Sequence, residues 1–185
     1  APESSADTPP ADIPPIIHGA IARPAASADE DTHDFDGVLK TALRVFRLDP
    51  RGIHGRDHWL RVERIGLHVG ARTGADLTVV RLFARLHDCM REDDGWDPYH
   101  GVRAADFAAT LRGSLIHLDD ERFERLDLAI RHHNDGGTTD DPTIGSCWDA
   151  DRLELQRLGI EPDPELLSTS LARHRATIDW AASLR

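Results

Sequence analysis

Apolar residues recur every three or four positions along this sequence from about residue 36 onward. Val62, Ile65 and Val69 within the segment 56–73 are one such stripe. This spacing matches the period of an α-helix, and no segment shows the strict alternation of a half-buried strand. We therefore expect an all-α bundle. Its helices are predicted at 36–48, 56–73, 76–89, 102–112, 119–133, 143–158 and 164–184.

The first 35 residues differ from the rest in composition. They are rich in Ala, Pro, Ser and Asp, and they close on the charged run DEDTHD. Such a segment buries too little apolar surface to offset the entropy that is lost on folding. We predict that residues 1–35 form a disordered or loosely attached tail, and that residues 36–185 form one helical domain.

The charge balance limits the partners of this chain. It has 22 Lys and Arg against 33 Asp and Glu, a formal charge of −11. We expect no binding to a nucleic-acid polymer, because affinity for a phosphate backbone comes largely from basic surface. A small phosphorylated substrate remains compatible with this charge, since a metal ion supplies positive charge locally. The sequence does not indicate an oligomeric state.

Cellular location is indicated only by what the sequence lacks. No apolar run approaches the roughly 18 residues of a membrane span, so no membrane association is expected. The stretch APESSADTPP has neither the basic start nor the apolar core of a signal peptide. Cys89 and Cys147 are too few for a disulfide framework. We expect a cytoplasmic protein.

Three predicted helices direct a histidine toward the core. His58 lies four residues before Val62, His87 lies four after Phe83, and His133 lies three after Ile130. Residues at these spacings share one face of a helix. Asp88 adjoins His87 and would be buried near it, whereas His132 is turned by about 100° from the face of its neighbour.

The helix predicted at 143–158 adds a carboxylate to this set. Asp151 follows Cys147 by four residues on an apolar stripe, whereas Asp149 falls on a more polar side. A single inward histidine is usually a hydrogen-bonded core residue, but several inward imidazoles and carboxylates are costly to bury together unless a cation joins them. Helix bundles build such sites, and this ligand set suits Fe, Mn, Zn, Co or Ni. The remaining histidines are interpreted as surface or packing residues: His18, His33, His68, His117 and His174.

The order of these residues resembles the HD-domain superfamily, which is named for its adjacent His-Asp pair. HWLRVERI (58–65) resembles the first-helix pattern of the family, and LHDCMRED (86–93) resembles its His-Asp helix end. DADRLEL (149–155) resembles the closing segment, in which the aspartate precedes Arg-Leu, and this again selects Asp151 over Asp149. The resemblance covers roughly residues 37–170. It implies a helical bundle that holds a divalent metal through His58, His87, Asp88 and Asp151.

Two further segments resemble a branch of the superfamily that adds two histidines and a second metal. They are DPYHG (97–101) and IRHHN (130–134). The resemblance implies that His100 and His133 are ligands and that Asp88 bridges the two metals. His132 competes with His133 for this role. His100 is expected in a loop. The sequence leaves open whether one or two ions bind, and whether they are Mn, Fe, Co, Ni or Zn.

Most members of the superfamily with known chemistry are phosphohydrolases. The resemblance therefore implies a phosphomonoesterase or phosphodiesterase in which metal-bound hydroxide attacks a small phosphorylated substrate, with nucleotides among the candidates. Asp88, Arg91 and Arg103 are the predicted catalytic residues, because the two arginines flank the segment that carries His100. Other residues are candidate substrate or phosphate contacts: His54, Arg61, His132 and Arg152.

Two other functions are compatible with the same residues. A small branch of the superfamily uses a histidine-rich site of this kind in a di-iron oxygenase. A metal-stabilised binding domain without catalysis is the second alternative. No residue in the sequence distinguishes hydrolase from oxygenase.

Overall fold

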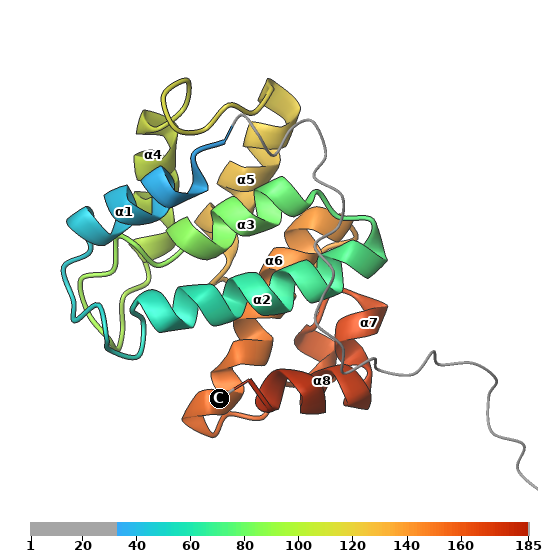
Figure 1. The fold of residues 1–185 in the computed structure, drawn as a ribbon. Helices are drawn as coiled ribbons and strands as arrows, with labels where there is room; N and C mark the ends of the chain where they lie inside the picture. Colours follow the sequence, from blue (N-terminus) through green and yellow to red (C-terminus); the bar gives the residue numbers. More distant parts are fainter. Residues whose placement is uncertain (1–32, 185) are drawn as a thin grey trace, which may run out of the picture.

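The computed structural model describes residues 33–184, which form helices and turns with no β-strand among them (Figure 1). This confirms the all-α prediction. The α-helices are α1 (Phe35–Val45), α2 (Arg56–Thr73), α3 (Leu77–Leu86), α4 (His100–Thr110), α5 (Asp120–His132), α6 (Pro142–Glu154), α7 (Ser170–Arg173) and α8 (Arg175–Ala182). Two short 3₁₀ helices, η2 (Leu155–Leu158) and η3 (Pro164–Leu166), lie between α6 and α7.

Aspartate side chains start four of these helices. Asp34, Asp76, Asp119 and Asp141 accept hydrogen bonds from backbone N–H groups in the first turns of α1, α3, α5 and α6. These bonds satisfy donors that have no partner within the helix. Helix α2 ends at Gly74, whose φ of 79° lies in the left-handed region that glycine adopts without strain. The helix boundaries near the site therefore have local causes in the sequence.

The prediction of a single C-terminal helix at 164–184 was wrong. The chain instead forms η3, α7 and α8, and the φ of −68° and ψ of 131° at His174 separate the last two. The buried carboxylate of Asp149 accepts the N–H groups of Ser168 and Thr169. These contacts hold the backbone before α7 in an extended conformation. A continuous helix through the same residues would not allow these contacts.

The predicted tail lies almost entirely outside the described residues, and so does His18. His33, Asp34 and Phe35, which the sequence analysis places in the tail, are part of the fold. His33 and Phe35 are buried, and Asp34 caps α1. The domain therefore includes residues at least from His33.

Helix α6 lies at the centre of the bundle and packs against α2, α3, α5 and α8 (Figure 1). Helix α3 packs against α1 and α5, and α4 packs on α5. The core between them is filled by large apolar side chains such as Trp59, Phe83 and Leu126. Cys89 and Cys147 are buried and free. No helix within the described range combines the length and the apolar character that a membrane span requires.

Candidate metal centre

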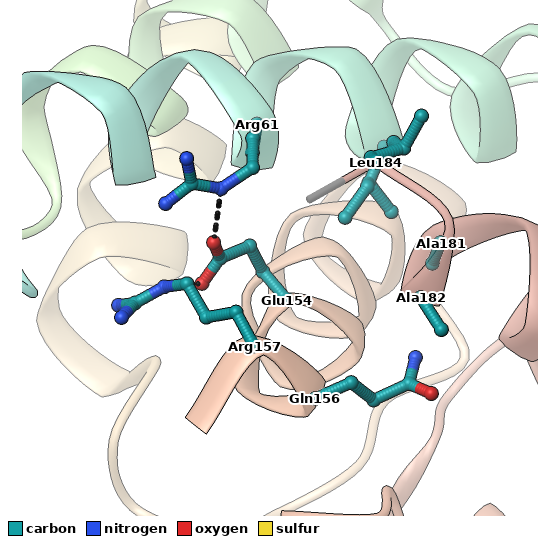
Figure 2. Close-up of a pocket in the computed structure, with 8 residues that line it drawn as sticks. Arg61, Glu154, Gln156, Arg157, Ala181, Ala182 and Leu184 are labelled. Atoms are coloured by element: carbon teal, nitrogen blue, oxygen red, sulfur yellow. Dashed lines mark hydrogen bonds and ion pairs between the residues drawn. The ribbon is translucent and has the colours of Figure 1, made fainter. Parts of the chain in front are cut away.

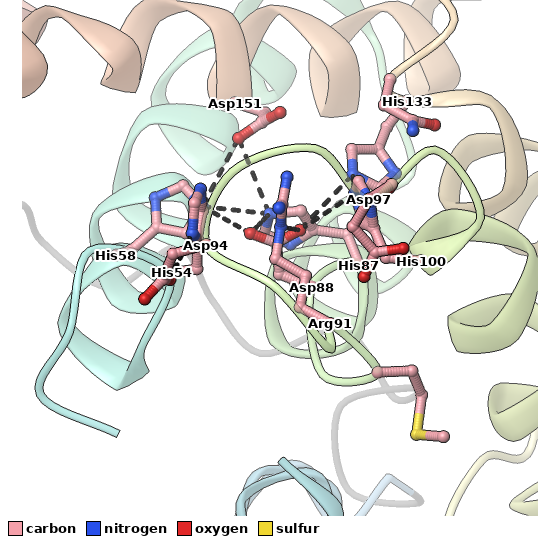
Figure 3. A network of polar contacts seen from close by, with 12 residues as sticks. His54, His58, His87, Asp88, Arg91, Asp94, Asp97, His100, His133 and Asp151 are labelled. Carbon is pink, nitrogen blue, oxygen red and sulfur yellow. Dashed lines mark hydrogen bonds and ion pairs between the residues drawn. The ribbon is translucent and has the colours of Figure 1, made fainter. Parts of the chain in front are cut away.

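Six titratable side chains meet where five helices begin or end (Figure 3). One lies in the first turn of α2, one is the first residue of α4, and one lies in the last turn of α6. Two adjacent residues follow the end of α3, and one follows the end of α5. The partial negative charge at the C-terminal ends of α3, α5 and α6 favours a cation here, and the N-terminal ends of α2 and α4 oppose it in part. The six residues are His58, His87, Asp88, His100, His133 and Asp151.

Four of these residues form a first group, which we call site A. The Oδ2 atom of Asp88 lies 3.4 Å from the Nε2 atom of His58 and 3.7 Å from that of His87. The Oδ1 atom of Asp151 lies 3.5 Å and 3.6 Å from the same two nitrogens. Two imidazole nitrogens and two carboxylate oxygens thus surround one point.

The other oxygen of Asp88 faces a second group, which we call site B. Its Oδ1 atom lies 3.2 Å from the Nε2 atom of His100 and 3.6 Å from that of His133. In Figure 3, His58 lies on one side of Asp88, and His100 and His133 lie on the other. The two sites adjoin, because His87, His133 and Asp151 also lie within ligand reach of one another. The two oxygens of Asp88 thus face different groups of histidines.

Hydrogen bonds fix the orientation of all four imidazoles. The Nδ1 atoms of His87, His100 and His133 donate to backbone carbonyl oxygens. These carbonyls belong to the third residue before each histidine: Ala84, Asp97 and Ile130. His58 instead donates from Nδ1 to the carboxylate of Glu154, at 2.8 Å. A neutral imidazole that donates through Nδ1 carries its lone pair on Nε2, so all four rings present a metal-ligating atom to the cluster.

The distances between these nitrogens fit bound metal ions. The Nε2 atoms of His100 and His133 are 2.8 Å apart, and those of His58 and His87 are 3.2 Å apart. Two lone pairs at such distances repel each other unless a proton or a cation lies between them. Adjacent ligands on one ion at roughly 2.1 Å are themselves about 3.0–3.4 Å apart, close to the separations found here. The residues present could therefore hold a metal ion.

The electrostatics of the cluster also favour cations. Burial would raise the pKa of Asp88, but the surrounding histidines, His87 first among them, hold it well below its ordinary value. The pKa of Asp151 is lowered by His87 and His58 in the same way, again against the effect of burial. Burial would lower the pKa of His58, but its hydrogen bonds to Asp88 and Glu154 raise it to about 9, so without metal this ring carries a proton that a bound cation would displace. Both carboxylates are therefore ionised at neutral pH.

The predicted arginines lie at different distances from this cluster. Arg91 donates from Nε to Oδ1 of Asp88 at 3.0 Å, so it contacts the centre directly. Arg103 donates to the carbonyl oxygen of Met90 and to Asp97, and thereby holds the segment that precedes His100. Its contacts make it a support for this segment and place none of its donors on the ligands.

The remaining candidate contacts lie at the rim or away from the site. His54 pairs through Nδ1 with Asp94 at 2.8 Å, and its ring centroid lies 6.1 Å from that of His58. His132 is paired with Asp135 and its side chain is 45% exposed. The structure thus brings His133 into the cluster and turns His132 to solvent. Arg152 donates to the carbonyl oxygen of Leu166, outside the cluster.

Two expectations about local structure need correction. Asp149 was expected on a polar helix side, yet it is fully buried and accepts hydrogen bonds from Ser168 and Thr169. The segment that contains these two residues packs over that side of α6, which helix periodicity alone does not reveal. His100 was expected in a loop but is the first residue of α4. Helix α4 starts two residues earlier than its apolar pattern indicates.

Glu154, which no sequence pattern singled out, contacts His58 from outside the cluster. Its side chain is 2% exposed and accepts from Arg61 Nε and Arg157 Nε, each at 2.6 Å. Figure 2 shows these three side chains at one end of a small hollow between α2, α6 and the C-terminal segment. Glu154 follows Asp151 by three residues, so the shared helix face was a usable signal. Arg61, a candidate substrate contact from the sequence, is engaged in this ion pair with Glu154.

Comparison with solved structures identifies the architecture. A crystal structure described as a predicted HD superfamily hydrolase, from an uncultured Thermotogales bacterium, superposes with a TM-score of 0.64. The match covers 83% of this chain and 88% of the other, at 24% sequence identity. The chain has the HD-domain fold. No family model and no curated protein matches the sequence. The resemblance noted from His58, His87-Asp88 and Asp151 thus agrees with a fold comparison over most of the HD domain.

Proposed function

We propose that this HD-domain protein is a metal-dependent hydrolase of phosphate esters. The observation that carries the proposal is the division of Asp88 between two ligand groups, with one oxygen toward His58 and the other toward His100. Such an arrangement suits two adjacent cations, which together can stabilise the attacking and the leaving oxygen of a phosphoryl transfer. The fold that the chain shares with a predicted HD superfamily hydrolase supports hydrolysis in general.

The residues of the chain have distinct parts in this proposal. Divalent metal held by the histidines and aspartates of the cluster would polarise a phosphoryl oxygen and lower the pKa of a coordinated water. Arg91, which contacts Asp88 at the edge of the cluster, orients a phosphate oxygen that reaches the centre. Burial lowers the pKa of His54 despite its hydrogen bond to Asp94, so its imidazole is neutral at pH 7 and its Nε2 can accept a proton or a hydrogen bond.

We propose a small phosphorylated substrate, with nucleotides as the first candidates, and no nucleic-acid polymer. The segment between Arg91 and His100 carries two highly exposed aromatic side chains, Trp96 at 87% and Tyr99 at 68%. Asp94 and Asp97 of the same segment contact His54 and Arg103, which keeps this segment beside the centre. An exposed ring at the edge of a phosphate site is suited to stacking on a nucleobase.

The test is a panel of phosphate monoesters and diesters, including nucleotides, incubated with metal-loaded protein in the absence of oxygen. We expect release of phosphate or alcohol from at least one substrate. Asp88→Asn should abolish that release, because it removes the carboxylate that both ligand groups share. His132→Ala should retain it, since this side chain points to solvent.

The outcomes of the panel separate the alternatives. Turnover only with bound iron and dioxygen would reject the hydrolase in favour of a di-iron oxygenase. A protein that binds two metals but turns over no substrate under either condition would instead support a binding domain. A cytoplasmic location remains part of the proposal and is tested by fractionation of the producing cell.

A further inference from the structure

One of the four histidine ligands is held differently from the other three. His87, His100 and His133 donate from Nδ1 to neutral backbone carbonyl oxygens within their own helix or turn. His58 donates to a carboxylate that lies 96 positions away in the sequence, on α6. A carboxylate partner makes an imidazole a stronger metal ligand than a neutral carbonyl does, because it stabilises the positive charge that the ring shares with the metal.

The carboxylate concerned, Glu154, is buried and rigidly held. Arg61 from α2 donates to its Oε1 atom, and Arg157 from η2 donates to its Oε2 atom, beside His58. Arg157 also donates to the carbonyl oxygen of Ile53, next to the turn that carries His54. The two guanidinium groups, each at 2.6 Å, stabilise the ionised form of this carboxylate. The group is therefore a fixed anion behind the metal centre.

We propose that Glu154 is a positioning residue that makes site A the tighter of two unequal metal sites. The carboxylate fixes the ring of His58 with Nε2 toward site A and increases the basicity of that nitrogen. Site B, formed by His100, His133 and the other oxygen of Asp88, has no such carboxylate among its described contacts. This inference rests on the proposed two-metal centre, and it adds an order of filling: site A first, then site B.

The experiment measures metal affinity, which is independent of any substrate. Metal-free protein is titrated with Zn²⁺ in competition with a chromophoric chelator, for wild type and for Glu154→Gln. Loss of a carboxylate partner of this kind weakens metal binding by about 10–100-fold. We expect that weakening in the tighter of the two binding steps, with the weaker step unchanged.

A matched control comes from α2. Glu63 is also a mostly buried carboxylate paired with two arginines, at 2.7 Å from Arg85 and 3.4 Å from Arg81, but it contacts none of the ligands. Glu63→Gln should lower thermal stability in the metal-free state as Glu154→Gln does, and should leave both affinities unchanged. An equal loss of affinity in the two variants would show that Glu154 acts only through general stability, and would overturn the proposal.

The assignment to site A is tested in a background that lacks site B. The His100→Ala protein should bind one ion. Adding Glu154→Gln should lower the affinity for that ion by the same factor of about 10–100. Unchanged affinity in the double variant, or equal weakening of both steps in the single variant, would reject the proposal while leaving a two-metal hydrolase intact. A wild type that binds no metal would reject the proposed function as well.

Discussion

Asp149 and Asp151 are two residues apart on α6, but their replacement by alanine should have different effects. Asp149→Ala should lower the stability of the fold, and Asp151→Ala should weaken metal binding. Asp149 accepts the N–H of Ser168 at 2.6 Å and the N–H and hydroxyl of Thr169 at 2.8 Å and 2.7 Å. Each hydrogen bond to a charged acceptor contributes about 1.5–3 kcal/mol, and water entering the gap recovers part of it. We therefore expect Asp149→Ala to lower the free energy of unfolding by about 3–5 kcal/mol.

Asp151→Ala loses the contacts of that carboxylate with His58 and His87 even without metal. The effect that distinguishes it from Asp149→Ala appears when metal is added. An ion at 100 times its dissociation constant stabilises a folded protein by about 2.7 kcal/mol, provided that the unfolded chain does not bind it. Wild type and Asp149→Ala should both gain that amount, and Asp151→Ala should gain much less.

The assay is urea denaturation followed by circular dichroism, for the three proteins with and without Zn²⁺. The quantity compared is the gain in unfolding free energy on adding metal. The same metal-dependent gain in Asp149→Ala and Asp151→Ala would refute the account of α6. So would an Asp149→Ala protein as stable as wild type, because the three hydrogen bonds would then contribute nothing.

Three further predictions concern neighbouring histidines, pH and substrate. His133→Ala should lose the metal of site B whereas His132→Ala retains it, as measured by elemental analysis of the dialysed proteins. Burial lowers the pKa of His68, which stacks on Trp180 at 3.9 Å, from 6.5 to about 4. The unfolded chain therefore binds this proton more readily, so stability is full above pH 6.5 and falls toward pH 4; His68→Gln should flatten that decline in urea denaturation. Trp96→Ala should raise KM for a nucleotide several-fold with little change in kcat, and should leave KM for a non-aromatic phosphate ester unchanged.

Helix periodicity was sufficient to find the residues of the cluster that lie within helices. His58 and Asp151 share faces with buried apolar residues, and the phase of each side chain could be read from the spacing. The same logic succeeded for His87, although that residue lies just beyond α3, because its backbone is still helical with a φ of −53° and a ψ of −38°. The face of a helix on which a side chain lies depends on its spacing from neighbouring residues, so the local sequence is enough to predict it.

Features that depend on contacts between distant segments were not accessible in this way. Asp149 is buried because residues 168 and 169 pack over it, and those same residues break the predicted C-terminal helix. The spacing of apolar residues within α6 cannot reveal a contact with a segment so far along the sequence. Glu154 is an intermediate case, since its spacing from Asp151 marks its face but not its partner His58 on α2. His100 was found only through the family resemblance, because a first helical residue has no preceding turn from which to read a phase.

The central claim is that Asp88 joins two metal ions, one held by His58, His87 and Asp151 and the other by His100 and His133. The most direct test is the number of metal ions per chain in protein saturated with Zn²⁺ and then freed of unbound metal, for wild type and His100→Ala. We predict about two ions in wild type and about one in the variant, since a site needs several convergent ligands to retain its ion. A single ion in both proteins would contradict it.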